Sequence, residues 1–298
     1  MSLIVENVSK SFGEKLVVNN ISLQMKEPGV FGLLGTNGAG KTTTIRMILN
    51  IVKKDSGNIK WCDEPTAEQV TKFGYLPEER GLYPKVKVIE QLMYFARLRG
   101  VKTEKSKKDI DYWLKRLDAS QYANMQAEKL SKGNQQKIQF IATIIHDPEL
   151  IFMDEPFSGL DPVNTELFKG VIYELIDRKK YIIMSSHQMS TVEEFCKEIL
   201  IIKNGNTVLS GNLKDIKRSY GRSNLVLNCE GNITELAAEQ GITNISKNAT
   251  GYELKISNEE QAYKLLEKIL SKRYMLDKFE IREPSLHEIF IEKVGEAK

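Results

Sequence analysis

The stretch "GLLGTNGAGKTTTIRMI", residues 32–48, decides how the rest of the chain is interpreted. It places four glycines between a short apolar run and a sequence of helical character. Glycine loses more conformational freedom on folding than any other residue, so this density of glycine indicates a backbone that must come very close to something. The residues that match the phosphate-loop pattern G-x-x-x-x-G-K-[ST] are Gly35, Thr36, Asn37, Gly38, Ala39, Gly40, Lys41 and Thr42.

The residue types in this loop suit a polyphosphate. Successive backbone N–H groups form a concave anion site, and the N-terminus of the following helix adds partial positive charge. Lys41 supplies a point charge for the β- and γ-phosphates, and the Thr42 hydroxyl is a ligand for Mg²⁺. A glycine-rich turn that only caps a helix is the simpler alternative. The buried-strand pattern of "VFGLL" (30–34) and the helical pattern after the loop favour the phosphate site.

A second motif, "LIFMDEP" (150–156), has a buried strand that ends in two acids. Asp154 is placed to hold Mg²⁺ through water, and Glu155 to polarise an attacking water as a general base. Two acids after a strand mean little alone, because exposed strand ends often carry them. Together with the phosphate loop they predict a nucleoside-triphosphate hydrolase.

The order of elements predicts an α/β first part. Apolar strands at 150–154, 181–186 and 198–203 alternate with helical segments, which is typical of a parallel sheet. The "KNGN" turn (203–206) signals a hairpin after the last of these strands. Residues from about 85 to 146 are predicted to form a helical subdomain, and its apolar stripes are most simply helix core.

The composition changes near the end of this part. A polar, basic stretch at 214–224 predicts a linker, and the short strand and helix patterns after it predict a small α+β domain. We therefore expect a first domain over 1–215 and an accessory domain over 222–298.

Composition excludes several classes of protein. The formal net charge of +3 is too weak to indicate a nucleic-acid partner. The three cysteines, Cys62, Cys196 and Cys229, are too far apart for a zinc site or a disulfide scaffold, so a reducing compartment is expected. The N-terminus lacks a signal-peptide pattern, and no apolar run approaches the roughly 20 residues needed to span a bilayer. A cytoplasmic location is expected.

Further motifs resemble those of the nucleotide-binding subunit of an ABC transporter, over roughly residues 3–210. "LSKGNQ" (130–135) resembles the signature loop of that family and "SGLD" (158–161) its D-loop. His187 in "SSHQM" resembles the switch histidine, and Phe12 in "VSKSFG" the aromatic residue that stacks on adenine. "GYLPEERGLYP" (74–84) resembles the loop that joins the core to the helical subdomain. The motifs occur in the order of the family.

The resemblance implies a P-loop NTPase core with a mixed sheet, a helical signature subdomain, and the α+β C-terminal domain. It also implies that ATP and Mg²⁺ are bound between two subunits arranged head to tail. The catalytic residues implied are Glu155, His187, Lys41 and Glu78, and the metal ligands are Thr42, Asp154 and Glu78. The nucleotide-contacting residues implied are Phe12, Gly35, Asn37, Gly38, Ala39, Gly40, Lys41, Thr42 and Thr43 of one subunit, and Ser131 and Gly133 of the other.

The sequence departs from the family pattern at three positions. Lys132 stands where the first glycine of the signature usually stands, and Asn134 stands in place of glutamine. Glu78 replaces the usual glutamine of the connecting loop, so it adds negative charge near the γ-phosphate and puts the metal dependence in question. "LSKGNQQK", "LPEERGLYP" and the "PSLHEIF" ending together resemble one branch, the bacterial ATPases of sodium and drug exporters.

The resemblance implies a separate membrane subunit that carries the transport path, with this chain on the inner face of the membrane as a homodimer or heterodimer and no nucleic-acid partner. One alternative is a soluble ATPase of the same superfamily, but the sequence lacks the long heptad insertion of repair proteins and the second cassette usual in translation proteins. Another is an ATP sensor without turnover, against which Glu155 and His187 argue.

Overall fold

The computed structural model describes residues 1–66, 72–79, 81–248 and 251–295. The chain divides into two compact units, Met1–Ser210 and Gly211–Lys298, and each has its own core. Among the described residues, none of the helices combines the length and the apolar character needed to cross a lipid bilayer.

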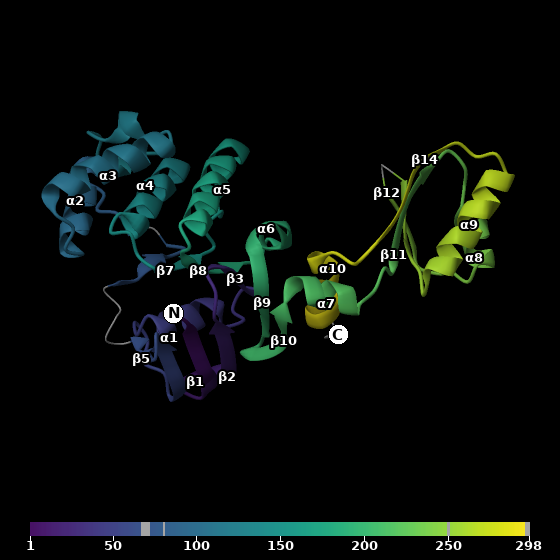
Figure 1. The fold of residues 1–298 in the computed structure, drawn as a ribbon, viewed down its shortest axis with the longest axis horizontal. Coiled ribbons are helices and arrows are strands. Elements are labelled where there is room, and N and C mark those ends of the chain that lie inside the picture. The colour runs from purple at the N-terminus through teal and green to yellow at the C-terminus, as the bar shows by residue number, and fades with distance from the viewer. Residues whose placement is uncertain (67–71, 80, 249–250, 296–298) are drawn as a thin grey trace. The chain divides into compact units, whose positions relative to one another are not determined.

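The first unit is built on a sheet with the strand order β10-β9-β3-β8-β7-β6 (Figure 1). Its strands are β3 (Gly29–Gly35), β6 (Gly74–Leu76), β7 (Leu150–Asp154), β8 (Tyr181–Ser186), β9 (Cys196–Lys203) and β10 (Asn206–Asn212). The strands from β9 to β6 pair in parallel. The expected buried runs at 150–154 and 181–186 are confirmed as strands, because every residue in β7 and β8 is buried. The turn at Asn204 and Gly205 leads into β10, as predicted.

The register of the parallel strands brings their carboxyl ends to one edge. Leu76 pairs with Met153, and Asp154 pairs with Ser185. Leu34 pairs with Ser186, next to the start of the phosphate loop. Ligand sites of open α/β sheets lie outside this edge, so the fold alone brings residues near 35, 78, 155 and 187 to one place.

A second, antiparallel sheet and one helix cover a face of the central sheet. The elements are β1 (Leu3–Phe12), β2 (Lys15–Met25), β4 (Ser56–Trp61), β5 (Glu64–Pro65) and α1 (Lys41–Ile48). Alternate residues of the central strands, such as Leu33, Phe152 and Ile183, pack into a common core with them. Strand β4 escaped the sequence-based prediction because only Ile59 and Trp61 in it are buried, and Ser56, Gly57 and Asn58 before them are typical of a turn.

Helices form the remainder of the first unit. They are α2 (Val88–Leu98), α3 (Thr103–Arg116), α4 (Lys132–Ile144), α5 (Pro162–Asp177) and α6 (Met189–Phe195). The first three lie within the predicted helical subdomain, 85–146 (Figure 1). The Ser131 side chain caps α4 by accepting a hydrogen bond from the Asn134 N–H group, and Asp161 caps α5 in the same way through Asn164.

The second unit has a four-stranded antiparallel sheet with the order β12-β13-β11-β14. Its elements are α7 (Leu213–Ser219), β11 (Asn224–Cys229), α8 (Thr234–Glu239), β12 (Ile245–Asn248), β13 (Gly251–Lys255), α9 (Glu259–Ser271), β14 (Leu276–Arg282) and α10 (Leu286–Gly295). From β11 to β14 this is the split β-α-β, ferredoxin-like arrangement, and α8 and α9 lie together against the sheet (Figure 1).

The expected linker at 214–224 is wrong over most of its length, because α7 occupies it. Asn212 caps this helix by accepting hydrogen bonds from the Lys214 and Asp215 N–H groups. Leu213 and Ile216 are buried, so two apolar residues suffice to fold a stretch whose composition is polar.

Candidate nucleotide site

The loop between β3 and α1 is shaped by its neighbours as well as by its glycines. A Cβ atom on Gly35 would lie 2.5 Å from the Ile202 carbonyl oxygen, and one on Gly40 would lie 2.9 Å from the Val17 carbonyl oxygen. Gly40 has a φ of 111°, a conformation that favours glycine. The sequence predicted these glycines on the ground that a ligand comes close to the backbone. At Gly35 and Gly40 a second reason applies, because neighbouring backbone already excludes a side chain.

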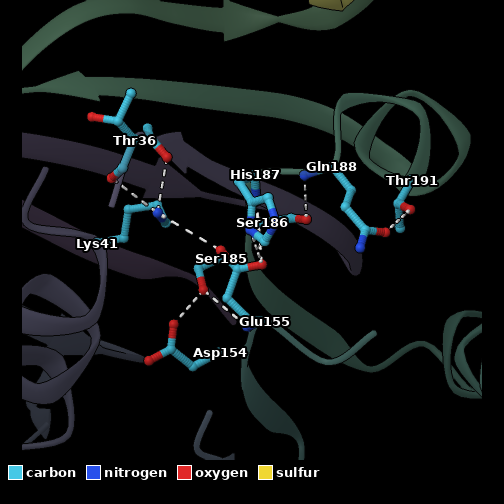
Figure 2. A network of polar contacts seen from close by, with 10 residues as sticks. Thr36, Lys41, Asp154, Glu155, Ser185, Ser186, His187, Gln188 and Thr191 are labelled. Atoms are coloured by element: carbon cyan, nitrogen blue, oxygen red, sulfur yellow. Dashed lines mark hydrogen bonds and ion pairs between the residues drawn. The ribbon is translucent and has the colours of Figure 1, made fainter. Parts of the chain in front are cut away.

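Lys41 is held inside the loop. Its Nζ donates hydrogen bonds to the carbonyl oxygens of Gly35 (2.8 Å) and Thr36 (3.2 Å), and it lies 3.7 Å from Oε1 of Glu155 (Figure 2). The Lys41 residue is only 6% exposed. Two carbonyl oxygens and one carboxylate therefore hold the ammonium group at the mouth of the loop. A bound phosphate can replace them as the partner of this ammonium group.

The chain turns sharply at Glu155. This residue has a φ of 49°, unusual for any residue but glycine, asparagine or aspartate. Its N–H group points back at Ser185, with the carbonyl oxygen and Oγ of Ser185 both 3.2 Å away. The Ser185 hydroxyl also donates to Oδ1 of Asp154 (Figure 2). Ser185 thus orients both acids, a role that the sequence interpretation missed but that the parallel pairing of Asp154 with Ser185 implies.

His187 completes this group from the end of β8. Its Nδ1 lies 2.9 Å from Oε2 of Glu155, and its backbone N–H group is 3.4 Å from the same oxygen (Figure 2). The structure therefore joins Lys41, Asp154, Glu155 and His187 in one network, although they come from three separate segments of the sequence.

Two carboxylate oxygens in this network are open to a metal ion or to a water molecule. Oδ2 of Asp154 and Oε1 of Glu155 are buried and accept no hydrogen bond. Buried acceptors without a donor are costly, so they point to a cation or water. Carboxylate and hydroxyl oxygens are the ligands that Mg²⁺ prefers, and Mg²⁺ is usually held by one or two carboxylates together with substrate phosphates. Among the described residues, no cluster of three or more His, Cys, Asp or Glu side chains could hold a metal ion.

A cavity of about 320 Å³ opens over the loop. Its lining residues are Lys15, Val17, Asn37, Gly38, Ala39, Gly40, Lys41, Thr42, Thr43, Glu78 and Glu155. Glu78 thus faces the same space as the phosphate loop. Lys15 and Val17, from β2, were not anticipated, because nothing in a strand pattern reveals which loop it will border.

Six of the expected site residues lie outside this lining, and four of them were expected in the same half of the site as the phosphate loop. Phe12 is 51% exposed at the end of β1, where it pairs with the lining residue Lys15. His187 contacts the lining residue Glu155 directly, and Asp154 is linked to Glu155 through the Ser185 hydroxyl. Gly35 contributes its carbonyl oxygen to Lys41.

The signature residues Ser131 and Gly133 are also absent from the described lining of the cavity. They lie at the start of α4, with Ser131 exposed. A Cβ atom on Gly133 would come within 3.3 Å of Asn164, at the start of α5. Of the connecting loop, residues 74–79 and 81–84 are described, and Arg80 lies outside the described residues.

Comparisons with known proteins agree with this geometry. The family model described as "ABC transporter" matches residues 18–158, and the model described as "ATP-binding protein DrrA1-3-like, C-terminal domain" matches residues 211–294. The uncharacterized ABC transporter ATP-binding protein YhaQ of Bacillus subtilis (strain 168) is 46% identical over 98% of both chains.

Two other comparisons bear on function and fold. The linearmycin resistance ATP-binding protein LnrL of Bacillus subtilis (strain 168) is 31% identical over 98% of both chains. The dimeric structure of MJ0796, a bacterial ABC transporter cassette, superposes with a TM-score of 0.65 at 22% identity, covering 71% of this chain and 98% of that one. The likeness to that cassette concerns the fold.

Proposed function

Since this chain belongs to the ABC transporter ATP-binding proteins and is the ATPase subunit of a transporter, we propose that it powers export through a separate membrane protein. In this proposal, Mg–ATP is hydrolysed between two ATP-binding subunits. The observation that carries this proposal is the network that joins Lys41, Glu155 and His187 at the mouth of the phosphate loop.

The loop binds the phosphates of ATP. Backbone N–H groups from Asn37 to Thr43 supply donors, and Lys41 moves its ammonium group from the carbonyl oxygens of Gly35 and Thr36 to the β- and γ-phosphates. Thr42, Asp154 and Glu78 would hold the metal ion, which would neutralise phosphate charge. The exposed ring of Phe12 serves as a stacking surface for the adenine.

Glu155 takes the proton of the attacking water. Its backbone is fixed by Ser185, and its carboxylate is held between Lys41, near Oε1, and His187, near Oε2. Oε1 accepts no hydrogen bond, so it has a defined direction and is open to the proton of the water. His187 is half exposed, so its ring can reach a γ-phosphate while it remains in contact with Glu155. Hydrolysis of this kind depends mainly on positioning and charge stabilisation around the γ-phosphate.

The second half of the site comes from another subunit. Ser131 and Gly133 lie at the N-terminus of α4, where free N–H groups and partial positive charge favour a phosphate. Their place outside the cavity of their own chain supports a head-to-tail dimer in which they meet the partner's ATP. The dimeric cassette reported above offers a precedent for such an assembly.

We infer the membrane partner and the direction of transport from proteins that are similar to this chain. LnrL, named for resistance to linearmycin, supports export. We assign the transport path to a separate membrane chain, because relatives of this chain are named ATP-binding proteins. We place this subunit on the inner face of the membrane, where ATP is available. The loop near Tyr83, which is 50% exposed, is a candidate contact with the partner.

Affinity purification tests the proposal directly. Glu155→Gln, which should retain ATP binding and lose hydrolysis, is purified from native membranes in detergent with ATP, beside wild type. Recovery of a multi-span membrane protein at comparable stoichiometry supports the transporter. Recovery of soluble proteins alone, with ATPase activity present in the wild type, would favour a soluble ATPase. Equal and negligible ATPase rates in both proteins, with tight ATP binding, would favour a sensor.

A further inference from the structure

A row of polar contacts connects helix α4 to the segment that carries Glu78. Nε2 of His146, just beyond the helix, lies 3.2 Å from the Phe73 carbonyl oxygen. The Thr143 hydroxyl lies 3.1 Å from the Tyr75 carbonyl oxygen. A Cβ atom on Gly74 would sit 2.7 Å from the Thr143 carbonyl oxygen, so the two backbones touch here. The row continues toward the site at Gln139.

Gln139 holds the backbone on both sides of Glu78. Its Nε2 donates to the carbonyl oxygens of Pro77 (3.2 Å) and Glu79 (3.0 Å), and its Oε1 accepts from the Gly81 N–H group (3.1 Å). Three of the four hydrogen-bonding positions of the carboxamide are therefore used. Gln139 is only 5% exposed, so solvent is poorly placed to replace these bonds.

A carboxamide is the group that this geometry requires. Leucine would fill the same space but leave two carbonyl oxygens and one N–H group without their partner. Glutamate would keep an acceptor for Gly81 while placing a carboxylate against the carbonyl oxygens of Pro77 and Glu79. Because the two bonded carbonyls flank Glu78, either change releases the backbone that aims its side chain at the cavity.

We propose that Gln139 is a positioning residue for hydrolysis: it fixes Glu78 over the phosphate loop by clamping Pro77, Glu79 and Gly81 to helix α4. This inference rests on the proposed function, in which Glu78 acts at the nucleotide. Ser131 caps the N-terminus of the same helix, and Gly133 lies in its first turn. One helix then positions an acid of its own site and the residues offered to the partner's site.

A second buried glutamine, Gln91 on α2, holds loop backbone in a similar way to Gln139. Gln91 is 1% exposed, donates to the Val86 carbonyl oxygen (3.2 Å) and accepts from the Tyr83 N–H group (3.2 Å). Gln91 therefore fixes residues 83–86, which come later in the chain than Glu78, and neither of its partners is adjacent to Glu78 in the sequence. Gln91→Leu is therefore a control for the loss of a buried glutamine that holds loop backbone.

A double-mutant cycle tests the inference in the full chain. Gln139→Leu should lower kcat on the order of tenfold with little change in KM, since misplaced groups cost turnover. In a Glu78→Ala background, Gln139→Leu should have no further effect, whereas Gln91→Leu should act to the same degree in both backgrounds. If Gln139→Leu does not fold, Gln139→Glu replaces it and should behave alike. If Gln139→Leu lowers kcat by the same factor in the wild-type and Glu78→Ala backgrounds, the inference is overturned.

Hydrogen exchange separates this inference from the proposed function. In Glu155→Gln protein, Mg–ATP should slow amide exchange in residues 36–43 and in residues 77–84. With Gln139→Leu added, protection should persist at 36–43 and be lost at 77–84. Undiminished protection at 77–84 would refute the role of Gln139. No protection at 36–43 in the parent protein would instead refute nucleotide binding, and with it the proposed function.

Discussion

Nδ1 of His187 lies 2.9 Å from Oε2 of Glu155, and the two side chains differ in exposure, 52% against 7%. The carboxylate is thus buried while its partner reaches solvent. Lys41 approaches the other oxygen of Glu155 to 3.7 Å. A carboxylate held from two sides has little freedom to rotate, so the direction of its free lone pairs is set before a substrate arrives.

The first prediction concerns His187. His187→Ala removes the group that fixes Oε2 of Glu155, so kcat should fall by about a hundredfold while the affinity for ATP changes by less than about threefold. Steady-state ATPase assays and calorimetric titration of ATP measure the two quantities. His287→Ala, a change at an exposed histidine of the second unit, is the control and should leave the rate unaltered. A rate for His187→Ala near that of wild type would show that Glu155 needs no such partner.

The second prediction concerns Lys41. Lys41→Met keeps most of the buried stem but removes the charge that two carbonyl oxygens hold at the loop mouth. Mg–ATP should bind at least about thirtyfold more weakly, because one charge-assisted contact to phosphate is lost. Isothermal titration calorimetry gives the affinity, and Lys115→Met, at an exposed position on α3, is the control. Unchanged affinity in Lys41→Met would place the phosphates elsewhere.

Much of the fold was predictable because strong local patterns coincide with buried structure. The runs "LIFMD" and "YIIMSS" are strands with every residue buried, so their apolar composition was sufficient. Strand β6 is only Gly74–Leu76, too short to form a pattern, and is fixed by pairing with β7. Helix α7 was missed because a capping asparagine and two buried residues outweigh a polar composition.

The same contrast holds within the site. The phosphate loop and the acids at 154 and 155 follow from motifs with a known chemistry. Ser185 lies in the quoted stretch "SSHQM", but that motif pointed to His187 alone, and Gln139 carries no motif. The roles of both residues come from the neighbours that strand pairing and packing give them. The left-handed backbone at Glu155 likewise depends on a turn that the composition of "DEPFSG" does not reveal.

The third prediction concerns pH and the second unit. Glu288 accepts hydrogen bonds from the N–H group (2.8 Å) and hydroxyl (2.8 Å) of Ser285 and from Nδ2 of Asn224 (2.6 Å), and pairs with Lys255 (3.1 Å). Burial favours a higher pKa, but these contacts outweigh it and lower the pKa of the Glu288 carboxyl from 4.5 to about 2. A pKa depressed by folding stabilises the unit above pH 4.5, and this stabilisation is lost as pH falls from 4.5 to about 2.

Glu288→Gln should therefore destabilise the second unit at pH 7 by about 1 kcal/mol, a value reduced for partial solvent screening. The difference from wild type should shrink toward pH 2. Differential scanning calorimetry of the full chain at both pH values measures it, with Glu239→Gln on the exposed side of α8 as the control. If the loss of unfolding free energy in Glu288→Gln stays constant across this pH range, the effect comes from packing rather than from the charge of Glu288.

The last prediction concerns Glu78 and the metal. Glu78 lines the same cavity as Thr42, and oxygen ligands with negative charge bind Mg²⁺ more strongly than a neutral amide does. Glu78→Gln should therefore raise the Mg²⁺ concentration for half-maximal ATPase activity about threefold to tenfold. Glu79→Gln, at the adjacent exposed acid, should leave it unaltered, because Glu79 is absent from the described lining of the cavity. The rate is measured against free Mg²⁺ at saturating ATP, and magnesium-dependent ATP binding is followed separately by calorimetry. If both variants need the same Mg²⁺ concentration as wild type, Glu78 contributes nothing to holding the metal, and its charge must instead act on the attacking water or on loop position.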